Sequence, residues 1–245
     1  MIYIAPMRLS TGTLYLVRWL NENGHEAFRA KNETTTARML RNVRRGDLVV
    51  GWGTTLPEFP AGVKLLNKKH IGSKFQELEC LARANVQVPE YSLRPQGRGW
   101  YARTYHHQCA NDLLANLNRG DYYVKHVDAV HELRFHVMKG EVFRVGYKVK
   151  DGPDAHPIFK SEEAGWHMVY GRESAGNLWQ LRGREDLRQA ALASVKACKY
   201  DFGAVDLATT KDGGYVVWEV NSAPGIDHVT VRRYGEQLIR IAQGE

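Results

Sequence analysis

Two strand-like segments near the end of the chain carry a pair of carboxylates in a fixed relation, and this pair most constrains what the chain can form. The segments read DFGAVDLATT and YVVWEVN, and the turn residues KDGG separate them. A loop over all four turn residues and a two-residue turn at DG set the same register, in which Asp206 lies opposite Glu219. Asn221 shares a face with Glu219 because side chains alternate along a strand. The sequence therefore predicts Asp206, Glu219 and Asn221 on one face of an antiparallel hairpin.

The acidic pair points to a bound cation. The same register adds to its face Ala204, Ala208, Tyr215 and Val217, and puts on the other face Val205, Leu207, Val216, Trp218 and Val220. Both faces are therefore expected to be covered, and buried carboxylates opposite each other are unfavourable unless a positive charge compensates them. A hard divalent ion such as Mg²⁺, held together with nucleotide phosphates, fits these oxygen ligands. The alternative is a solvent-facing hairpin whose acids pair with nearby Lys or Arg side chains.

Composition restricts the class of protein. Of the 245 residues, 43% are hydrophobic and 25% are charged, which is typical of a globular protein and argues against a disordered, collagen-like or disulfide-rich chain. The net charge of +7 suits an anionic partner such as a nucleotide, a phosphorylated substrate or nucleic acid. The three cysteines, Cys80, Cys109 and Cys198, form no CxxC pair and favour a reducing compartment. With no long apolar run and no signal-peptide pattern, we expect a cytoplasmic protein without a membrane span.

Hydrophobic periodicity predicts the order of helices and strands. A strand over 1–5, a helix over 11–23 and a buried strand at LVVGWG indicate an N-terminal α/β unit with a parallel sheet. The rest is predicted to contain a helix over 67–85, strands over 86–93 and 100–105, a helix over 112–118, a strand over 121–127, a hairpin over 132–150 that turns at Lys139-Gly140, and a helix over 184–199 before the last hairpin. The segment 151–184 is the least regular and is expected to include a mobile loop.

These motifs, in this order, resemble the ATP-grasp superfamily, in particular the compact carboxylate–amine ligases related to the ribosomal-protein glutamate ligase. The run DFGAVDLATT…YVVWEVNSAPG is similar to that family's metal site, an Asp on one strand and Glu-x-Asn on the next. The resemblance assigns Asp206, Glu219 and Asn221 to the three metal positions. LLNKKHIGSKFQELECLARANVQVPEY resembles the family's lysine-bearing helix and the strand that follows it.

The resemblance covers about 67–225 and implies a fold. It is the ATP-grasp fold, in which two α+β lobes clasp ATP, preceded by a small α/β pre-grasp domain. The implied division is a pre-grasp domain over 1–66, an N-lobe over 67–120 and a C-lobe with the metal site over 121–245.

The resemblance also implies roles for individual residues. The matched nucleotide-binding positions are Lys74 and Arg103 for the phosphates, Lys125, His126 and Val127 for the adenine edge, and Glu132 for the ribose or nucleotide side. The matched catalytic positions are Arg134, near the transferring phosphoryl group, and Lys148, at the end of the central hairpin. The chain departs from the family where Arg103 replaces a lysine, where the loop TYHHQCAND lacks the glycines that cover the phosphates, and where Val149 replaces a second basic residue.

Each candidate also has an ordinary structural explanation. A lysine such as Lys74 on a helix is commonly solvated, and an arginine such as Arg134 on a half-buried strand commonly forms a structural ion pair. His106, His107 and Cys109 suggest zinc, but they lack a second ligand pair at suitable spacing, which favours a loop.

The function implied by the resemblance is an ATP-dependent carboxylate–amine ligase. ATP with Mg²⁺, or with Mn²⁺ in its place, would bind between the lobes, and an acyl-phosphate would react with an amine to give an amide or peptide bond. The implied substrates are small-molecule, peptide or protein carboxylates and amines. Two alternatives stay open: an ATP-grasp kinase for a small molecule, and a non-catalytic module that binds nucleic acid, although the basic residues are scattered rather than clustered with stacking aromatics. No motif specifies the donor, the acceptor or the oligomeric state.

Overall fold

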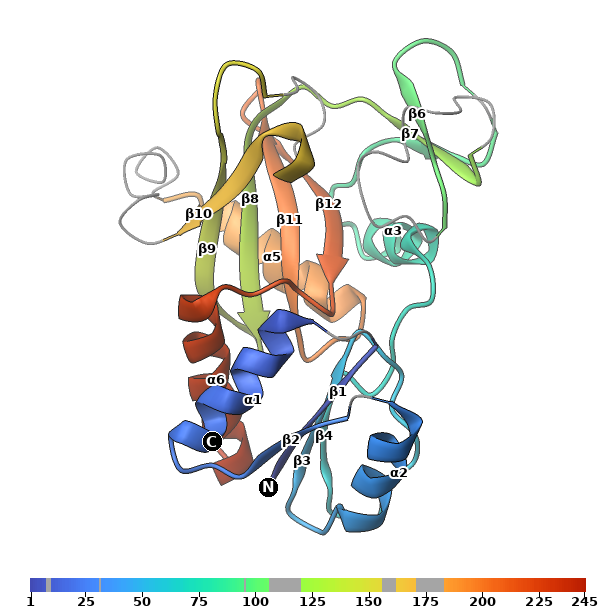
Figure 1. Ribbon diagram of the computed structural model, residues 1–245. Helices are drawn as coiled ribbons and strands as arrows, with labels where there is room; N and C mark the ends of the chain where they lie inside the picture. Colours follow the sequence, from blue (N-terminus) through green and yellow to red (C-terminus); the bar gives the residue numbers. More distant parts are fainter. Residues whose placement is uncertain (8–9, 31, 95, 106–119, 156–161, 171–182) are drawn as a thin grey trace.

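The computed structural model describes the chain apart from residues 8–9, 31, 95, 106–119, 156–161 and 171–182, and it contains three β-sheets (Figure 1). The helix expected over 112–118 and most of the loop that follows Arg103 lie outside the described residues. Among the described helices, none combines the length and the apolar composition that a membrane crossing requires. The cytoplasmic location stays a prediction.

The first sheet is parallel, as the alternation of strands and helices predicts. Its strand order is β2-β1-β3-β4, built from β1 (Ile2–Pro6), β2 (Ala27–Arg29), β3 (Leu48–Trp52) and β4 (Lys64–Leu66). Helices α1 (Thr11–Glu22) and α2 (Glu33–Asn42) connect the first three strands. The short β2, β4 and α2 were not predicted.

The second sheet is small and antiparallel, with the order β5-β7-β6. It follows helix α3 (Lys74–Arg83) and comprises β5 (Tyr91–Ser92), β6 (Trp100–Arg103) and β7 (Tyr122–Lys125). The helix expected over 67–85 is therefore wrong at its start. Ser73 caps α3 by accepting a hydrogen bond from the backbone N–H of Gln76. Asn67 lies before the helix at φ +50°, and its side chain bonds to the backbone of Asp201 and Phe202, so a tertiary contact overrides the helical pattern.

The third sheet is fully antiparallel and has the order β10-β9-β8-β11-β12. Its strands are β8 (Ala129–Met138), β9 (Glu141–Lys150), β10 (Trp166–Tyr170), β11 (Phe202–Thr210) and β12 (Tyr215–Asn221). The predicted turn between β8 and β9 is confirmed, because Lys139 and Gly140 both have positive φ. Strand β10 lies in the segment that was expected to be irregular.

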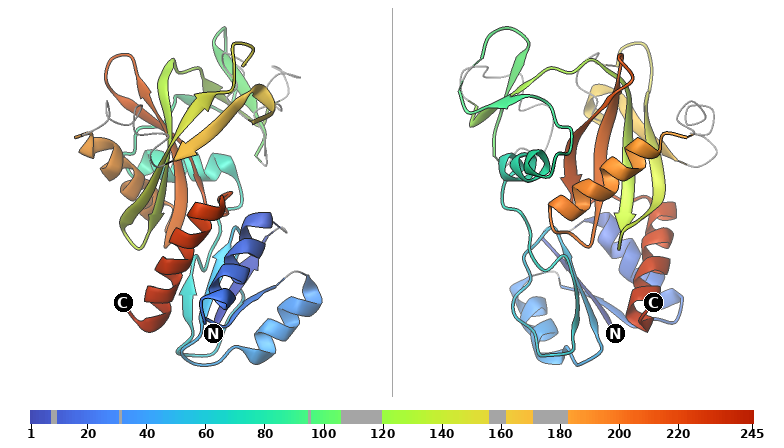
Figure 2. Two further views of the ribbon diagram at one scale, coloured as in Figure 1. Left: turned by 60° about the vertical axis from the view of Figure 1, so that its left-hand side comes forward. Right: turned by 180° about the vertical axis from the view of Figure 1, so that it is seen from behind.

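Helix α5 (Glu185–Ala197) covers one face of the third sheet, as the view from behind in Figure 2 shows. Leu187 and Val195 of the helix pack there against Phe135, Val205 and Val220 of the sheet. This burial leaves the opposite face, toward the viewer in Figure 1, to carry the polar side chains of the same strands.

Helix α6 (His228–Gln243), which the sequence analysis did not predict, returns to the N-terminal unit and packs against α1 (Figure 1). Tyr234 and Leu238 of α6 share a core with Leu16 of α1 and Ile4 of β1, and Phe202 of β11 joins the same core. The first and third sheets are therefore held together by one hydrophobic core that the last helix completes.

Candidate nucleotide and metal site

The hairpin of β11 and β12 has the predicted register at its acidic end. Asp206 pairs with Glu219, and Ala204 pairs with Asn221. Because neighbours of opposite strands share a face, the two carboxylates and the amide lie together on the face that α5 does not cover.

The other end of this hairpin does not have the predicted register. The pairing shifts by one residue after Asp206, so that Leu207 pairs with Val217 and Thr209 with Tyr215. The predicted acidic face was therefore wrong at Tyr215 and Val217, which pack in the core together with Leu207. The bulge lets β12 bury Val217 while it keeps Glu219 and Asn221 on the polar face.

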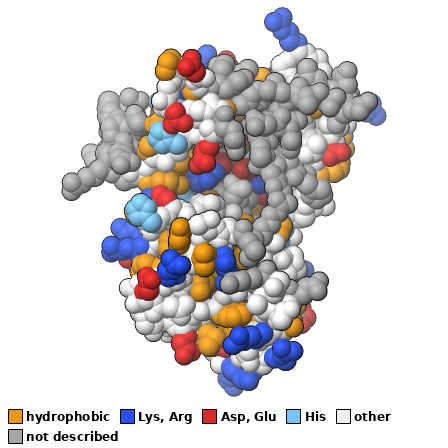
Figure 3. All heavy atoms as spheres, viewed as in Figure 1, with side chains coloured by type: hydrophobic (Ala, Val, Ile, Leu, Met, Phe, Trp, Pro, Cys, Tyr) orange, Lys and Arg blue, Asp and Glu red, His pale blue; other side chains and the backbone are white. Residues whose placement is uncertain are grey.

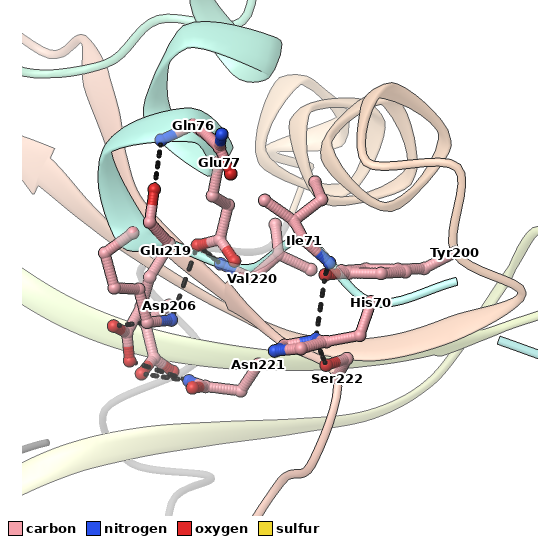
Figure 4. Close-up of polar contacts among 12 residues, drawn as sticks. His70, Ile71, Gln76, Glu77, Tyr200, Asp206, Glu219, Val220, Asn221 and Ser222 are labelled. Carbon is pink, nitrogen blue, oxygen red and sulfur yellow. Dashed lines mark hydrogen bonds and ion pairs between the residues drawn. The ribbon is translucent and has the colours of Figure 1, made fainter. Parts of the chain in front are cut away.

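Five side chains form one continuous set of polar contacts, which we call the acidic cluster: Asp206, Glu219, Asn221, Arg134 and Lys74. Figure 4 shows Asp206, Glu219 and Asn221 side by side. The Arg134 guanidinium binds Asp206 with two bonds, Nε to Oδ1 at 2.6 Å and Nη2 to Oδ2 at 2.7 Å. Asn221 Nδ2 donates to Glu219 Oε1 at 2.7 Å and to Asp206 Oδ2 at 3.3 Å. Lys74 Nζ lies 3.1 Å from Glu219 Oε2. The chain thus brings together all three predicted metal residues, one predicted phosphate-binding residue, Lys74, and one predicted catalytic residue, Arg134.

The electrostatics of the acidic cluster favour its ionised form. Burial alone raises the pKa of Glu219, but Lys74 and the Asn221 hydrogen bond outweigh it and hold that pKa below its usual range. Burial alone lowers the pKa of Lys74, but Glu219 and Glu77 outweigh it and raise that pKa above its usual range. Asp206 raises the pKa of Arg134 in the same way. The site is therefore a set of partly buried, paired charges, and acidic and basic side chains meet in a recess on this face (Figure 3).

A second ion pair continues this polar face along β8 and β9. Lys148 Nζ lies 3.1 Å from Glu132 Oε2. On strand β9, Gly146 lies opposite Arg134 of β8. A Cβ at Gly146 would lie 2.5 Å from the Tyr170 ring. The absence of a side chain at this position therefore allows the Tyr170 ring to lie near Arg134. Glu132 and Lys148 are thus adjacent to the acidic cluster, on the strands that the resemblance implies.

The remaining predicted residues lie on the second sheet and on the link to the third. Arg103 is the last residue of β6 and lies opposite Tyr122 of β7. Burial raises the pKa of Tyr122 to about 12, against the opposing effect of the Arg103 and Lys74 charges. Lys125 pairs with Glu90 at 2.6 Å on the surface.

Two backbone N–H groups of the segment proposed to bind adenine are already hydrogen-bonded within the protein. The N–H groups of Lys125 and His126 donate to the carbonyls of Glu90 and Gly99. Val127 is half-buried and lies two residues before the start of β8. We therefore expect the carbonyls of this segment and the N–H of Val127, rather than the other two amides, to be offered to a ligand.

Sequence reasoning missed two groups beside the acidic cluster. Glu77, one turn after Lys74 on α3, is buried, and burial raises the pKa of Glu77 to about 7 against the opposing effect of Lys74. Its signal was an acid within the apolar stripe of a helix. The second group joins His70, Ser222 and Tyr200: His70 Nδ1 lies 3.0 Å from Ser222 Oγ and 3.4 Å from the Tyr200 hydroxyl (Figure 4). No sequence spacing links these three positions.

Comparisons with known proteins identify the fold. No protein-family model matches the chain, and no curated protein matches its sequence. Among solved structures, the ATP-grasp ligase PsnB in complex with a minimal precursor, Mg and ADP has a TM-score of 0.65 at 13% identity, over 98% of this chain and 97% of that one.

Two further structures agree with this result. The D-alanine–D-alanine ligase of Bacillus anthracis has a TM-score of 0.63 at 13% identity, over 99% and 98% of the two chains. The macrocyclase MdnC of Microcystis aeruginosa MRC, bound to the precursor peptide MdnA, has a TM-score of 0.60 at 12% identity, over 97% and 99%. At these identities the likeness concerns the fold, and it confirms the fold class expected from the sequence. The chain has the ATP-grasp fold.

Proposed function

We propose that this protein is an ATP-dependent ligase that joins a carboxylate to an amine through an acyl-phosphate. The observation that carries the proposal is the acidic cluster, in which Asp206, Glu219 and Asn221 converge with Arg134 and Lys74 on the open face of the third sheet. The likeness to solved ATP-grasp ligases across nearly the whole chain supports it.

The donor set suits Mg²⁺ bound together with a nucleotide. In the part of the chain that the structure describes, no three His, Cys, Asp or Glu side chains form a metal cage. Two carboxylates and one amide carbonyl leave further positions to phosphate oxygens and water, as Mg²⁺ prefers. The similar structures named with Mg, ADP or ATP support this choice, and Mn²⁺ would fit the same oxygens. A Mg²⁺ ion held by Asp206, Glu219 and Asn221 would supply positive charge that offsets the charge of the nucleotide phosphates during phosphoryl transfer.

The chain's own cations bind and orient the phosphates. Lys74 pairs with Glu219 and Arg134 pairs with Asp206, and both cations would turn to phosphate oxygens when a metal binds those carboxylates. Arg134 then stabilises the negative charge that develops around the transferred phosphoryl group. Arg103 would add a further positive charge to the phosphates, and Lys148, paired with Glu132, would do so from β9.

The three proposed domains do not coincide with the three sheets, because β7 of the second sheet lies after residue 120. The unit over 1–66 precedes the grasp, the N-lobe over 67–120 supplies Lys74 and Arg103, and the C-lobe over 121–245 supplies the metal residues. The segment of Lys125, His126 and Val127 between the second and third sheets would hold adenine. Precursor peptides accompany PsnB and MdnC, so peptide carboxylates are the substrate class to test first, beside small-molecule carboxylates and amines.

Product analysis tests the reaction class. The protein is incubated with ATP, Mg²⁺ and a panel of peptide and small-molecule carboxylates, with hydroxylamine present to trap an acyl-phosphate as a hydroxamate. We expect ADP, inorganic phosphate and hydroxamate in equal amounts. A stable phosphorylated product without phosphate release would instead identify a kinase. No ATP binding at all, in protein that is folded, would remove both readings and leave the nucleic-acid module to be tested.

A further inference from the structure

We propose that Glu77, on helix α3, is a positioning residue that fixes the metal-binding strand β12 and holds Lys74 beside it. The inference rests on the proposed function and adds to it a residue to which the resemblance assigns no role. Its evidence is a set of contacts that connects the helix to the strand between its two metal-binding side chains (Figure 4).

Glu77 is a buried acid with two specific partners. Only 4% of the residue is exposed, and its Oε1 accepts the backbone N–H of Val220 at 2.8 Å. The same oxygen lies 3.4 Å from Lys74 Nζ. A buried carboxylate persists only where such partners offset its loss of water, so these contacts account for an acid on the apolar side of α3.

The bond to Val220 acts on the metal-binding residues directly. Val220 lies between Glu219 and Asn221, and β12 is the outermost strand of its sheet. An edge strand has backbone N–H groups that no neighbouring strand pairs. Here Glu77 takes the N–H of Val220, and the carbonyl of Gln87 takes the N–H of Val217 at 2.8 Å. The outer edge of β12 is therefore fixed at two points, and one of them sets the orientation of the two flanking side chains.

The contact with Glu77 gives Lys74 a second carboxylate partner beside Glu219. Lys74 Nζ lies between Glu219 at 3.1 Å and Glu77 at 3.4 Å. A metal ion on Glu219 would take away the first partner and leave the second. Glu77 then keeps the ammonium next to the phosphates without being a metal ligand, since its carboxylate points to the backbone of β12.

Three variants separate positioning from general stability. Glu77→Gln keeps an oxygen acceptor for the Val220 N–H and removes the charge that pairs with Lys74, whereas Glu77→Leu removes both. Glu79→Gln is the matched control, because Glu79 lies on the same helix, is half exposed and, among the described residues, forms an ion pair only with the exposed Arg83, at 3.8 Å. Binding of ATP is measured by calorimetry at a series of Mg²⁺ concentrations.

We expect the Mg²⁺ concentration for half-maximal ATP binding to rise about tenfold or more in Glu77→Leu and about threefold to tenfold in Glu77→Gln, as for the loss of a charge-assisted hydrogen bond. The control should stay within twofold of wild type. A purely structural role predicts a lower melting temperature and an unchanged Mg²⁺ midpoint, which would overturn the inference. If Glu77→Leu does not fold, the Mg²⁺ midpoint of Glu77→Gln alone tests the inference, and a midpoint within twofold of wild type would overturn it. Wild-type protein that binds no Mg²⁺-ATP would instead overturn the proposed function, and the inference with it.

Discussion

Removal of the Arg134 side chain tests whether the acidic cluster is held together by its cations in the metal-free protein. In Arg134→Met, Asp206 loses two short hydrogen bonds and keeps only the longer one from Asn221. It also faces Glu219 across the strand pair without its counter-charge. We therefore expect the variant to be less stable than wild type when no metal or nucleotide is present.

The magnitude follows from how far the pair is buried. Side-chain exposure is 23% for Arg134 and 16% for Asp206, between the fully buried and the fully exposed case. Breaking a buried pair costs about 3–5 kcal/mol, and an exposed pair contributes about 1 kcal/mol or less. We expect a loss of about 2 kcal/mol in the free energy of unfolding, which is about 4–8 °C in melting temperature for a chain of this size.

Urea and thermal unfolding in EDTA measure this loss. Arg184→Met is the matched control, because Arg184 makes the same two-bonded contact with Asp186, but on the surface. It should cost less than about 1 kcal/mol. The double variant Arg134→Met with Asp206→Asn should recover part of the loss, since the unpaired charge is gone. If Arg134→Met stays within about 0.5 kcal/mol of wild type, or if the two substitutions simply add, the reasoning is refuted.

Two further variants test the polar face. His136 is buried, and burial, together with the nearby arginine charges, holds its pKa well below the usual value. Below about pH 6.5 the unfolded chain therefore binds a proton that the folded chain does not bind. As a result, the free energy of unfolding falls with decreasing pH by up to about 1.4 kcal/mol per pH unit. Urea unfolding from pH 7.5 to 5.5 should show this slope reduced in His136→Gln but not in the exposed His228→Gln; equal slopes would contradict it. Gly146→Ala should lose about 1–3 kcal/mol in thermal unfolding, because its methyl group would overlap the Tyr170 ring. Gly152→Ala should lose less than about 0.5 kcal/mol, because no atom of the described residues lies within 4 Å of a Cβ at Gly152. Equal losses in the two glycine variants would refute the packing argument.

Local patterns in the sequence predict those parts of the fold that local chemistry determines. The parallel N-terminal sheet and the Lys139-Gly140 turn follow from periodicity and turn residues. The pairing of Asp206 with Glu219 was predicted correctly, but it depends on a bulge that was not predicted. The turn alone sets a register one residue different, and the bulge restores the predicted one at the acidic end.

Features that depend on contacts between distant segments were not predictable in this way. Asn67 is kept out of α3 by the backbone of Asp201 and Phe202, which no local pattern announces. Glu77 accepts the backbone N–H of Val220 on strand β12, far along the chain from α3. Helix α6 is a different case, since Val231, Tyr234 and Leu238 have a spacing that is typical of an amphipathic helix.

The central claim is that Asp206, Glu219 and Asn221 hold a metal together with ATP. Melting temperature with and without Mg²⁺-ATP, in wild type and in Glu219→Gln, tests it most directly. Ligand at about 100 times its dissociation constant stabilises the folded state by about 2.7 kcal/mol, or about 5–10 °C at this length. The account predicts this rise in wild type, its loss when EDTA replaces Mg²⁺, and its loss in Glu219→Gln. A folded wild-type protein whose melting temperature does not respond to Mg²⁺-ATP, or a variant that responds equally, would contradict it.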